Sequence, residues 1–161
     1  MTNPLHIPAQ ADVPIACDMS TAEDTPEERL AEYGRLFDRA LLRRERREDG
    51  VVFALRADAQ SRETVESLAR REAACCPFLE LRVDTVGDEV VFELIWPSVS
   101  AEQHAGADAM LDALYALPDH APRARFHPAP PPAASRMSGE SKSTSAASRS
   151  ARVALPANRC W

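Results

Sequence analysis

The sequence predicts an α+β fold, a two-layer sandwich with helices on one face of a mostly antiparallel sheet. Strand-like and helical hydrophobic patterns follow one another in the order β-α-β-α-β-β-α. A polar turn at residues 84–89 separates two strand patterns, residues 78–83 and 90–96, as expected of a β-hairpin. The composition changes near Pro118, which places the folded part before that residue.

The N-terminal residues form two segments of different character. Residues 1–11 are polar and broken by proline, and we expect a flexible arm. Residues 12–19 are β-prone and are predicted to form a short strand. Because side chains alternate along a strand, Val13, Ile15 and Cys17 share a face, and Cys17 is predicted to point into the core.

The first predicted helix begins at a strong start signal. Thr25 is a typical N-cap, Pro26 suits the first helical position, and Glu28 completes a capping box. Apolar residues at helical spacing extend the pattern to about Arg47. The arginine-rich run at 43–47 is interpreted as a solvated last turn favoured by the helix dipole, rather than as a phosphate-binding patch.

A second strand is predicted at residues 51–57, and Ser61 is predicted to cap a second helix. The pattern of this helix reaches Cys76, which precedes Pro77. A residue before proline is pushed out of helical geometry, so the helix is predicted to end there. Two adjacent cysteines therefore lie at a helix C-terminus.

The last predicted helix starts with a capping box of Ser100 and Gln103 and ends at Pro118. The predicted organisation is one α+β domain at residues 12–118 and a tail at residues 119–161. The tail is rich in Ala, Pro, Ser and Arg. Because such a composition cannot bury a core, we expect the tail to be disordered.

Charge and hydropathy argue against several classes of partner. Residues 1–118 hold 12 arginines and no lysine against 23 acidic residues, a formal charge of −11, and the remaining residues carry +5. An acidic folded part argues against nucleic acid as the main partner. No stretch approaches the roughly 18–20 apolar residues of a membrane span, and residues 1–19 lack the pattern of a secretory signal. We therefore expect no membrane partner and a cytoplasmic location, where thiols stay reduced.

The candidate site is the segment that ends the second helix. Glu72 is three residues before Cys75 and four before Cys76, so a carboxylate and two thiols can share one helix face. Cys17 is predicted to supply a third sulfur if its strand meets this helix end. In a reducing compartment these cysteines are interpreted as metal ligands, redox groups or buried filler before disulfides, and Cys160 is expected to be exposed and unrelated.

The lead hypothesis is a metal-binding module without catalytic residues. Adjacent thiolates suit soft, thiophilic ions. Three sulfurs favour Hg(II) or As(III), and the addition of a carboxylate gives a four-coordinate set for Zn(II), with Cu(I) as a further candidate. The predicted ligands are Cys75, Cys76, Cys17 and Glu72.

Two alternatives stay open. In a small thiol enzyme, a reductase or transferase, Cys75 or Cys76 is the nucleophile and Glu72 tunes it, but the dipole at a helix C-terminus disfavours a thiolate. In a structural or interaction domain, the cysteines are core filler and Glu72 pairs with an arginine. In that case Phe92, Trp96 and the last helix form either a homodimer interface or an ordinary part of the core. The candidate arginines are Arg56, Arg70, Arg71 and Arg82.

A family resemblance rests on the motif E-x-x-C-C-P-F-L, which runs from Glu72 to Leu79, and on the upstream segment 14–18. These features resemble a family of small, largely uncharacterised bacterial proteins, over about residues 12–117. The adjacent cysteines are also similar to those of mercury-handling proteins such as mercuric reductase and the mercuric transporter, which have other folds. The resemblance implies a thiol-based metal or metalloid function in detoxification or sensing.

Overall fold

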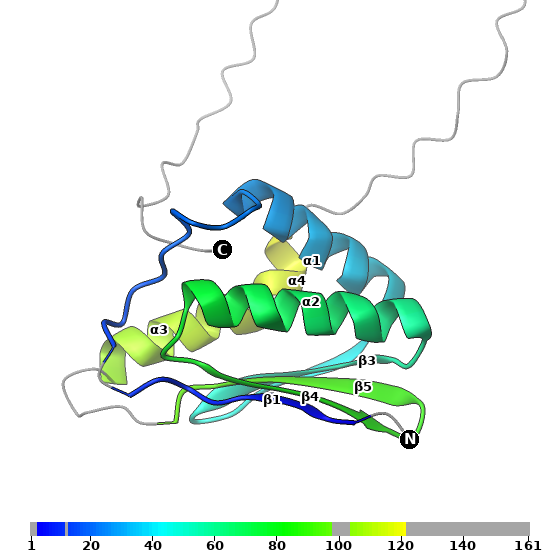
Figure 1. Cartoon of the computed structure of the whole chain (residues 1–161). Coiled ribbons are helices and arrows are strands. Elements are labelled where there is room, and N and C mark those ends of the chain that lie inside the picture. The colour runs from blue at the N-terminus through cyan, green and yellow to red at the C-terminus, as the bar shows by residue number, and fades with distance from the viewer. Residues whose placement is uncertain (1–2, 12, 98–103, 122–161) are drawn as a thin grey trace, which may run out of the picture.

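The computed structural model describes residues 3–11, 13–97 and 104–121. Within them an antiparallel sheet of five strands forms one layer and helices form the other (Figure 1). This arrangement confirms the predicted α+β fold with helices on one face of the sheet. Of the described helices, none combines the length and the apolar character needed to cross a bilayer.

The sheet consists of two hairpins and one N-terminal strand, and every neighbouring pair of strands is antiparallel. Gly50 begins an inner strand at a point where a Cβ atom would lie 2.6 Å from the carbonyl oxygen of Leu94, so this close approach requires glycine. The strands lie in the order β1 (Leu5–Ile7), β4 (Glu80–Val86), β5 (Glu89–Ile95), β3 (Gly50–Arg56) and β2 (Leu41–Arg46).

Strands β4 and β5 confirm the predicted C-terminal hairpin. Gly87 in its turn has a φ of 59°, a left-handed conformation that favours glycine. Phe92 and Trp96 are buried within this one chain, 0% and 3% exposed. Both side chains therefore belong to the core, which is the second of the two roles that the sequence allows them.

Helix α1 (Pro26–Ala40) begins as predicted. The backbone N–H of Glu28 donates to Thr25 Oγ1 at 3.2 Å, and the backbone N–H of Thr25 donates to the Glu28 carboxylate at 2.9 Å, which confirms the capping box. The predicted extension of the helix to Arg47 is wrong. Leu41 leaves helical geometry with φ −63° and ψ 125°, and the chain continues directly as β2.

Strand β2 places the arginine-rich run at an edge of the sheet, where pairing with β3 overrides local helical preference. The interpretation of this run as a solvated last helical turn is therefore wrong. Its arginines pair with acidic side chains: Arg43 with Glu89, Arg44 with Asp119, Arg46 with Asp108 and Asp112, and Arg47 with Glu45 and Glu93.

The N-terminal segments also differ from the prediction. Residues 5–7, expected in a flexible arm, form β1 and pair with β4. Residues 13–19, expected to form a strand, are irregular, because the backbone N–H of Ala16 bonds to the carbonyl of Pro14 at 2.9 Å within the segment itself. Cys17 is half-buried and packs against the core, although no strand carries it there.

Helix α2 (Ala59–Cys75) starts slightly earlier than predicted. Asp58 is its N-cap and accepts a hydrogen bond from the backbone N–H of Ser61 at 2.6 Å, so Ser61 lies in the first turn. The helix ends at Cys75 with Cys76 as its C-cap, in agreement with the stop signal from Pro77.

Two further helices, α3 (His104–Tyr115) and α4 (Leu117–His120), complete the helical layer. The predicted capping box of Ser100 and Gln103 lies outside the described residues, as does most of the predicted tail. Helix α3 ends at Tyr115, before Pro118. Pro118 instead lies in the first turn of α4, where proline is tolerated.

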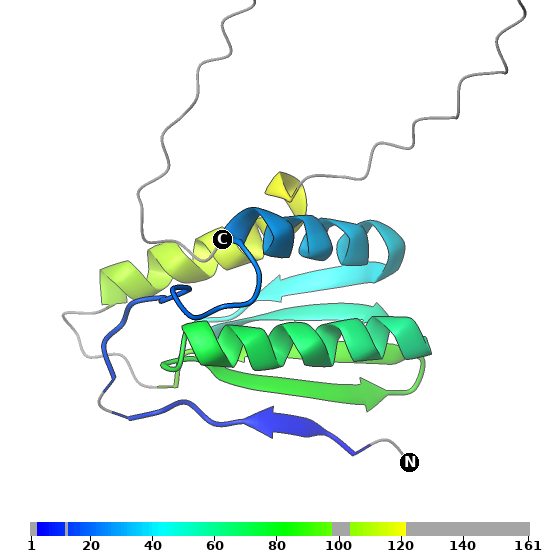
Figure 2. The ribbon, with the colours of Figure 1, turned by 45° about the horizontal axis from the view of Figure 1, so that its top comes forward.

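The segment between β1 and α1 crosses the C-terminal end of α2 (Figure 2). The backbone N–H of Asp18 donates to the carbonyl of Cys75 at 2.9 Å, and that of Gln10 donates to the carbonyl of Pro77 at 2.7 Å. The first of these bonds satisfies a carbonyl group that a helix end leaves open. The end of α2, the start of α1 and this crossing segment therefore meet at the cysteine pair.

Candidate functional site

The two adjacent cysteines face different partners. Cys76 forms a disulfide with Cys17 across 59 residues, with 4.7 Å between the Cα atoms. Cys75 keeps its thiol and is 2% exposed. The backbone explains this divergence, because Cys76 precedes Pro77 and leaves helical geometry, with φ −126° and ψ 66°.

The disulfide corrects the expectation that these cysteines are all reduced. That expectation followed from the predicted cellular location, whereas the bond depends on how the irregular segment 13–19 lies against α2. The hydrogen bond from Asp18 to Cys75 holds this segment in place. Cys17 therefore reaches the pair as the covalent partner of Cys76.

Glu72, Cys75 and Cys76 form a buried cluster in which one carboxylate oxygen and two sulfur atoms lie within 4.8 Å of one another. The Cys75 Sγ atom is 3.5 Å from Glu72 Oε2 and 3.5 Å from Cys76 Sγ. Glu72 and Cys76 are each 0% exposed. The structure thus brings three of the four predicted ligands together and attaches the fourth, Cys17, through the disulfide.

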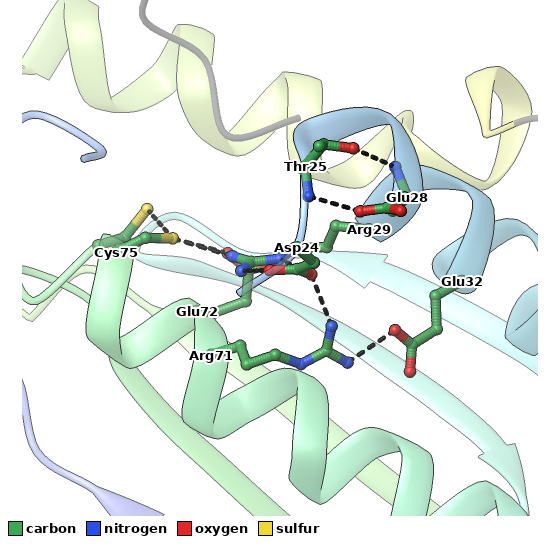
Figure 3. A network of polar contacts seen from close by, with 9 residues as sticks. Asp24, Thr25, Glu28, Arg29, Glu32, Arg71, Glu72 and Cys75 are labelled. Atoms are coloured by element: carbon green, nitrogen blue, oxygen red, sulfur yellow. Dashed lines mark hydrogen bonds and ion pairs between the residues drawn. The ribbon is translucent and has the colours of Figure 1, made fainter. Parts of the chain in front are cut away.

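A buried arginine that the sequence interpretation missed completes the cluster. Arg29 on α1 is 1% exposed, and its Nη1 donates to Cys75 Sγ at 3.1 Å and lies 3.6 Å from Glu72 Oε2 (Figure 3). The available signal was its position one helical turn before Tyr33, a residue of the apolar stripe. A charged residue on a buried stripe needs a partner of opposite charge.

The arginines predicted to pair with Glu72 are directed elsewhere, and that prediction is wrong because α1 rather than α2 or the sheet supplies the arginine. Arg56 is exposed at the end of its strand. The other three pair with different carboxylates: Arg70 with Glu66, Arg71 with Asp24 and Glu32, and Arg82 with Glu80.

Asp24 links the two helices through both of its carboxylate oxygens. It accepts hydrogen bonds from Arg29 Nε at 3.0 Å, Arg29 Nη2 at 2.6 Å and Arg71 Nη1 at 2.6 Å (Figure 3). The hydrogen bonds from Arg29 are the main cause that lowers the pKa of Asp24 to about 2, against the opposing effect of burial. Asp24 directly precedes the N-cap Thr25, so the capping box with Glu28 fixes its position.

The surroundings keep the arginine of the cluster charged. Burial by itself lowers the pKa of Arg29, but the hydrogen bond to Asp24 and the charges of Glu72 and Cys75 outweigh it, so the pKa is raised above its ordinary value. Burial first, and the charge of Glu72 second, raise the pKa of Tyr33. A cationic guanidinium and a neutral phenol therefore surround the carboxylate and the thiol at neutral pH.

A small pocket of about 150 Å³ adjoins the cluster. Cys75 and Arg29 form part of its wall, and each is nearly buried, at 2% and 1% exposed. The pocket is lined by Asp18, Thr21, Ala22, Glu23, Asp24, Arg29, Arg71, Ala74 and Cys75.

Comparisons of the chain with protein-family models, with curated proteins and with solved structures give no match. The fold and the site together define a small α+β protein with a buried thiol–guanidinium–carboxylate cluster beside a disulfide. This set of groups places soft sulfur ligands, a carboxylate and a disulfide bond side by side.

Proposed function

We propose that the reduced protein binds a soft metal or metalloid ion through the sulfurs of Cys75, Cys76 and Cys17, with Glu72 as a fourth ligand or a neighbouring base. The observation that carries this proposal is the buried cluster, in which two sulfur atoms and a carboxylate oxygen lie within 4.8 Å of one another. Thiolates are preferred ligands of soft ions. Reduction of the disulfide adds the Cys17 sulfur beside Cys76.

The charge around the cluster also favours a bound cation. Five of the described side chains form a network of ion pairs at the cluster. Two of them are positively charged, Arg29 and Arg71, and three are negatively charged, namely Asp24, Glu32 and Glu72. Each thiolate adds further negative charge to this buried site. A metal ion compensates such charge and stabilises the deprotonated thiol, despite the unfavourable dipole at the end of α2.

The ligand set limits the choice of ion. Three sulfurs favour Hg(II) or As(III), whereas participation of Glu72 favours four-coordinate Zn(II), and Cu(I) suits the sulfurs alone. The proposed role is cytoplasmic, as an accessory in detoxification or sensing of such an ion. The resemblance of residues 72–79 to the E-x-x-C-C-P-F family and to the vicinal cysteines of mercury-handling proteins supports this role.

A second candidate function, a small thiol enzyme, is favoured by one observation. Arg29 Nη1 lies 3.1 Å from Cys75 Sγ and supplies the cation that a thiolate nucleophile needs, and a pocket adjoins the same residue. In the reduced protein at neutral pH, Cys75 should then react with iodoacetamide faster than Cys160. A slower reaction at Cys75 would count against this candidate.

The metal proposal is tested with the reduced full-length protein, freed of reductant and titrated separately with Hg(II), As(III), Zn(II) and Cu(I). Native mass spectrometry and thiolate-to-metal absorption report the stoichiometry. We expect binding of one ion per chain, abolished in Cys75→Ser and Cys76→Ser and weakened in Cys17→Ser. The matched control is Cys160→Ser, which removes a thiol outside the described residues and should leave binding unchanged.

Two results would contradict the proposal. The first is unchanged affinity in both Cys75→Ser and Cys76→Ser. The second is an absence of binding in wild type while the double replacement of both cysteines by alanine retains the fold, which would leave the cysteines as packing residues.

A further inference from the structure

Beyond ion binding, we propose that the cluster carries out thiol–disulfide exchange with external dithiols, with Cys17 as the sulfur that is attacked. We further infer that formation of the Cys17–Cys76 disulfide releases the bound ion. The exchange itself does not depend on a metal, whereas the release rests on the metal-binding function proposed above.

Unequal burial of the two bonded cysteines determines where a reductant enters. Cys76 is 0% exposed, whereas Cys17 is half-buried in the crossing segment. Exchange requires a thiolate to contact one sulfur of the disulfide directly. An external thiolate therefore reaches Cys17, and Cys76 becomes the leaving group.

The exchange has two balanced steps. First, one thiolate of the external dithiol attacks Cys17 Sγ, an S–S bond forms between them, and the Cys17–Cys76 bond breaks with its electron pair on Cys76. Second, the other thiolate of the dithiol attacks its own mixed-disulfide sulfur, closes the external disulfide and expels Cys17 as a thiolate. Two electrons pass from the external dithiol to the cysteine pair, and the two new thiolates take up protons or bind the metal.

Cys75 and Arg29 lie where the leaving group develops its charge. Cys75 Sγ is 3.5 Å from Cys76 Sγ, within hydrogen-bond distance for sulfur, and Arg29 Nη1 donates to Cys75 Sγ at 3.1 Å. The Cys75 thiol can therefore share its proton with the departing Cys76, while the guanidinium stabilises the negative charge on the sulfur pair. Cys75 acts through Cys76 and is a positioning residue for the exchange.

The disulfide can open without disruption of a helix or strand, because the segment that carries Cys17 is irregular. Residues 13–19 belong to neither kind of element, and the backbone N–H of Asp18 bonds to the carbonyl of Cys75. This bond keeps the segment beside the helix end when the disulfide opens. The Cys17 sulfur therefore stays close enough to bond again or to join a metal ion.

The disulfide and a three-sulfur metal site exclude each other. A cysteine ligand must be a thiolate, and the reverse exchange, in which an external disulfide accepts two electrons and becomes a dithiol, converts two of the three sulfurs into a disulfide. The oxidised cluster retains Cys75 and Glu72 as its thiol and carboxylate ligands. An ion bound by three sulfurs should therefore dissociate when the disulfide forms.

The exchange is tested on the metal-free full chain, equilibrated with graded ratios of reduced to oxidised dithiothreitol. Alkylation followed by peptide mapping counts the thiols. We expect Cys17 and Cys76 to titrate together and reversibly, Cys75 to remain a thiol throughout, and far-UV circular dichroism to stay unchanged. The reversible titration of a disulfide should persist in Cys160→Ser and disappear in Cys17→Ser. Pairing of Cys75 with Cys76, or loss of the fold on reduction, would overturn the proposal.

The point of entry is tested with glutathione, a monothiol that leaves a mixed disulfide in place. We expect the glutathione adduct on Cys17, and an adduct on Cys76 would overturn the assignment. In Cys75→Ala the Cys17–Cys76 bond should still form, but dithiothreitol should reduce it several-fold more slowly. An unchanged rate would remove the positioning role of Cys75.

Release of the ion is tested after dithiothreitol has been removed, because that dithiol itself binds Hg(II) and As(III). The two ions are titrated separately into the reduced and the oxidised protein. Much tighter binding to the reduced form is the expected result, because the oxidised form retains single thiols but not the three-sulfur site, and equal affinity for both forms would overturn the release. If neither form binds an ion while the thiol titration succeeds, the exchange stands and the proposed metal function fails.

Discussion

At the scale of single residues, the site depends on one buried charge. Arg29 is 1% exposed and contacts Asp24, Glu72 and Cys75. Burial of an ion is favourable only when partners and hydrogen bonds compensate the lost hydration. Removal of one member therefore exposes the cost of burying the others.

We predict that Arg29→Met lowers the free energy of unfolding by about 3–5 kcal/mol, because it leaves the carboxylate of Glu72 buried without its arginine. Urea denaturation at pH 7 measures this loss. The matched control is Arg70→Met, whose side chain is 57% exposed and whose pair with Glu66 should contribute at most about 1 kcal/mol. The double variant Arg29→Met/Glu72→Gln should recover part of the stability. A loss in Arg29→Met no larger than in the control would contradict this account.

Residue spacing within one helix predicted part of the site correctly. The contacts between different helices could not be predicted from that spacing. The position of Glu72 one turn before the cysteines follows from helix geometry alone, so the cluster was predictable. The pairing with Arg29 depends on how α1 packs on α2, which no spacing within α2 reveals. A charge one turn before Tyr33 on an apolar stripe is the signal that identifies such an arginine.

At the scale of elements, the site is built by the irregular crossing segment as well as by the helices, because this segment supplies Cys17. Pro77 marked the end of α2 correctly, with Cys76 as the C-cap. The sequence pattern missed β2, because its arginines and Glu45 have helical preference and only pairing with β3 makes them a strand. It also assigned a strand to residues 12–19, of which the described residues 13–19 are irregular and held by a local hydrogen bond and the disulfide.

The disulfide that ties this segment to α2 should contribute measurably to stability. For a bridge that spans 59 residues, the loss of chain entropy in the unfolded state corresponds to about 4 kcal/mol. We predict that Cys17→Ser lowers the free energy of unfolding of the oxidised protein by up to this amount, as measured by guanidinium denaturation. Cys160→Ser serves as the control. Equal stability of Cys17→Ser and wild type would show that the bond contributes nothing to the native state.

At the scale of the whole molecule, polar contacts between separate elements connect the site to the free energy of unfolding. Asp24 holds Arg29 on α1 and Arg71 on α2, so its ionisation links the two helices. Its pKa is about 2 in the folded protein, compared with an ordinary value of 3.8. The folded state therefore binds this proton more weakly than the unfolded state does.

This difference predicts a loss of stability in acid. The contribution of Asp24 is fully present above about pH 4 and disappears as the pH falls towards about 2, with a total of about 2 kcal/mol. Its side chain is 15% exposed, so solvent screening reduces this figure only moderately. Urea denaturation from pH 7 to pH 2 should show a shallower decline for Asp24→Asn than for wild type. Parallel curves for the two proteins would rule out this contribution.

The residue at which α2 ends also determines the directions of the two cysteine side chains. Successive side chains on a helix are separated by about 100° around its axis, and Cys76 departs from this geometry, with φ −126° and ψ 66°. Pro77 stops the helix between two side chains of identical chemistry and thereby decides which one enters the bond and which one stays with Arg29. The two cysteines have the same side-chain chemistry, and their different partners follow from the different backbone conformations of Cys75 and Cys76.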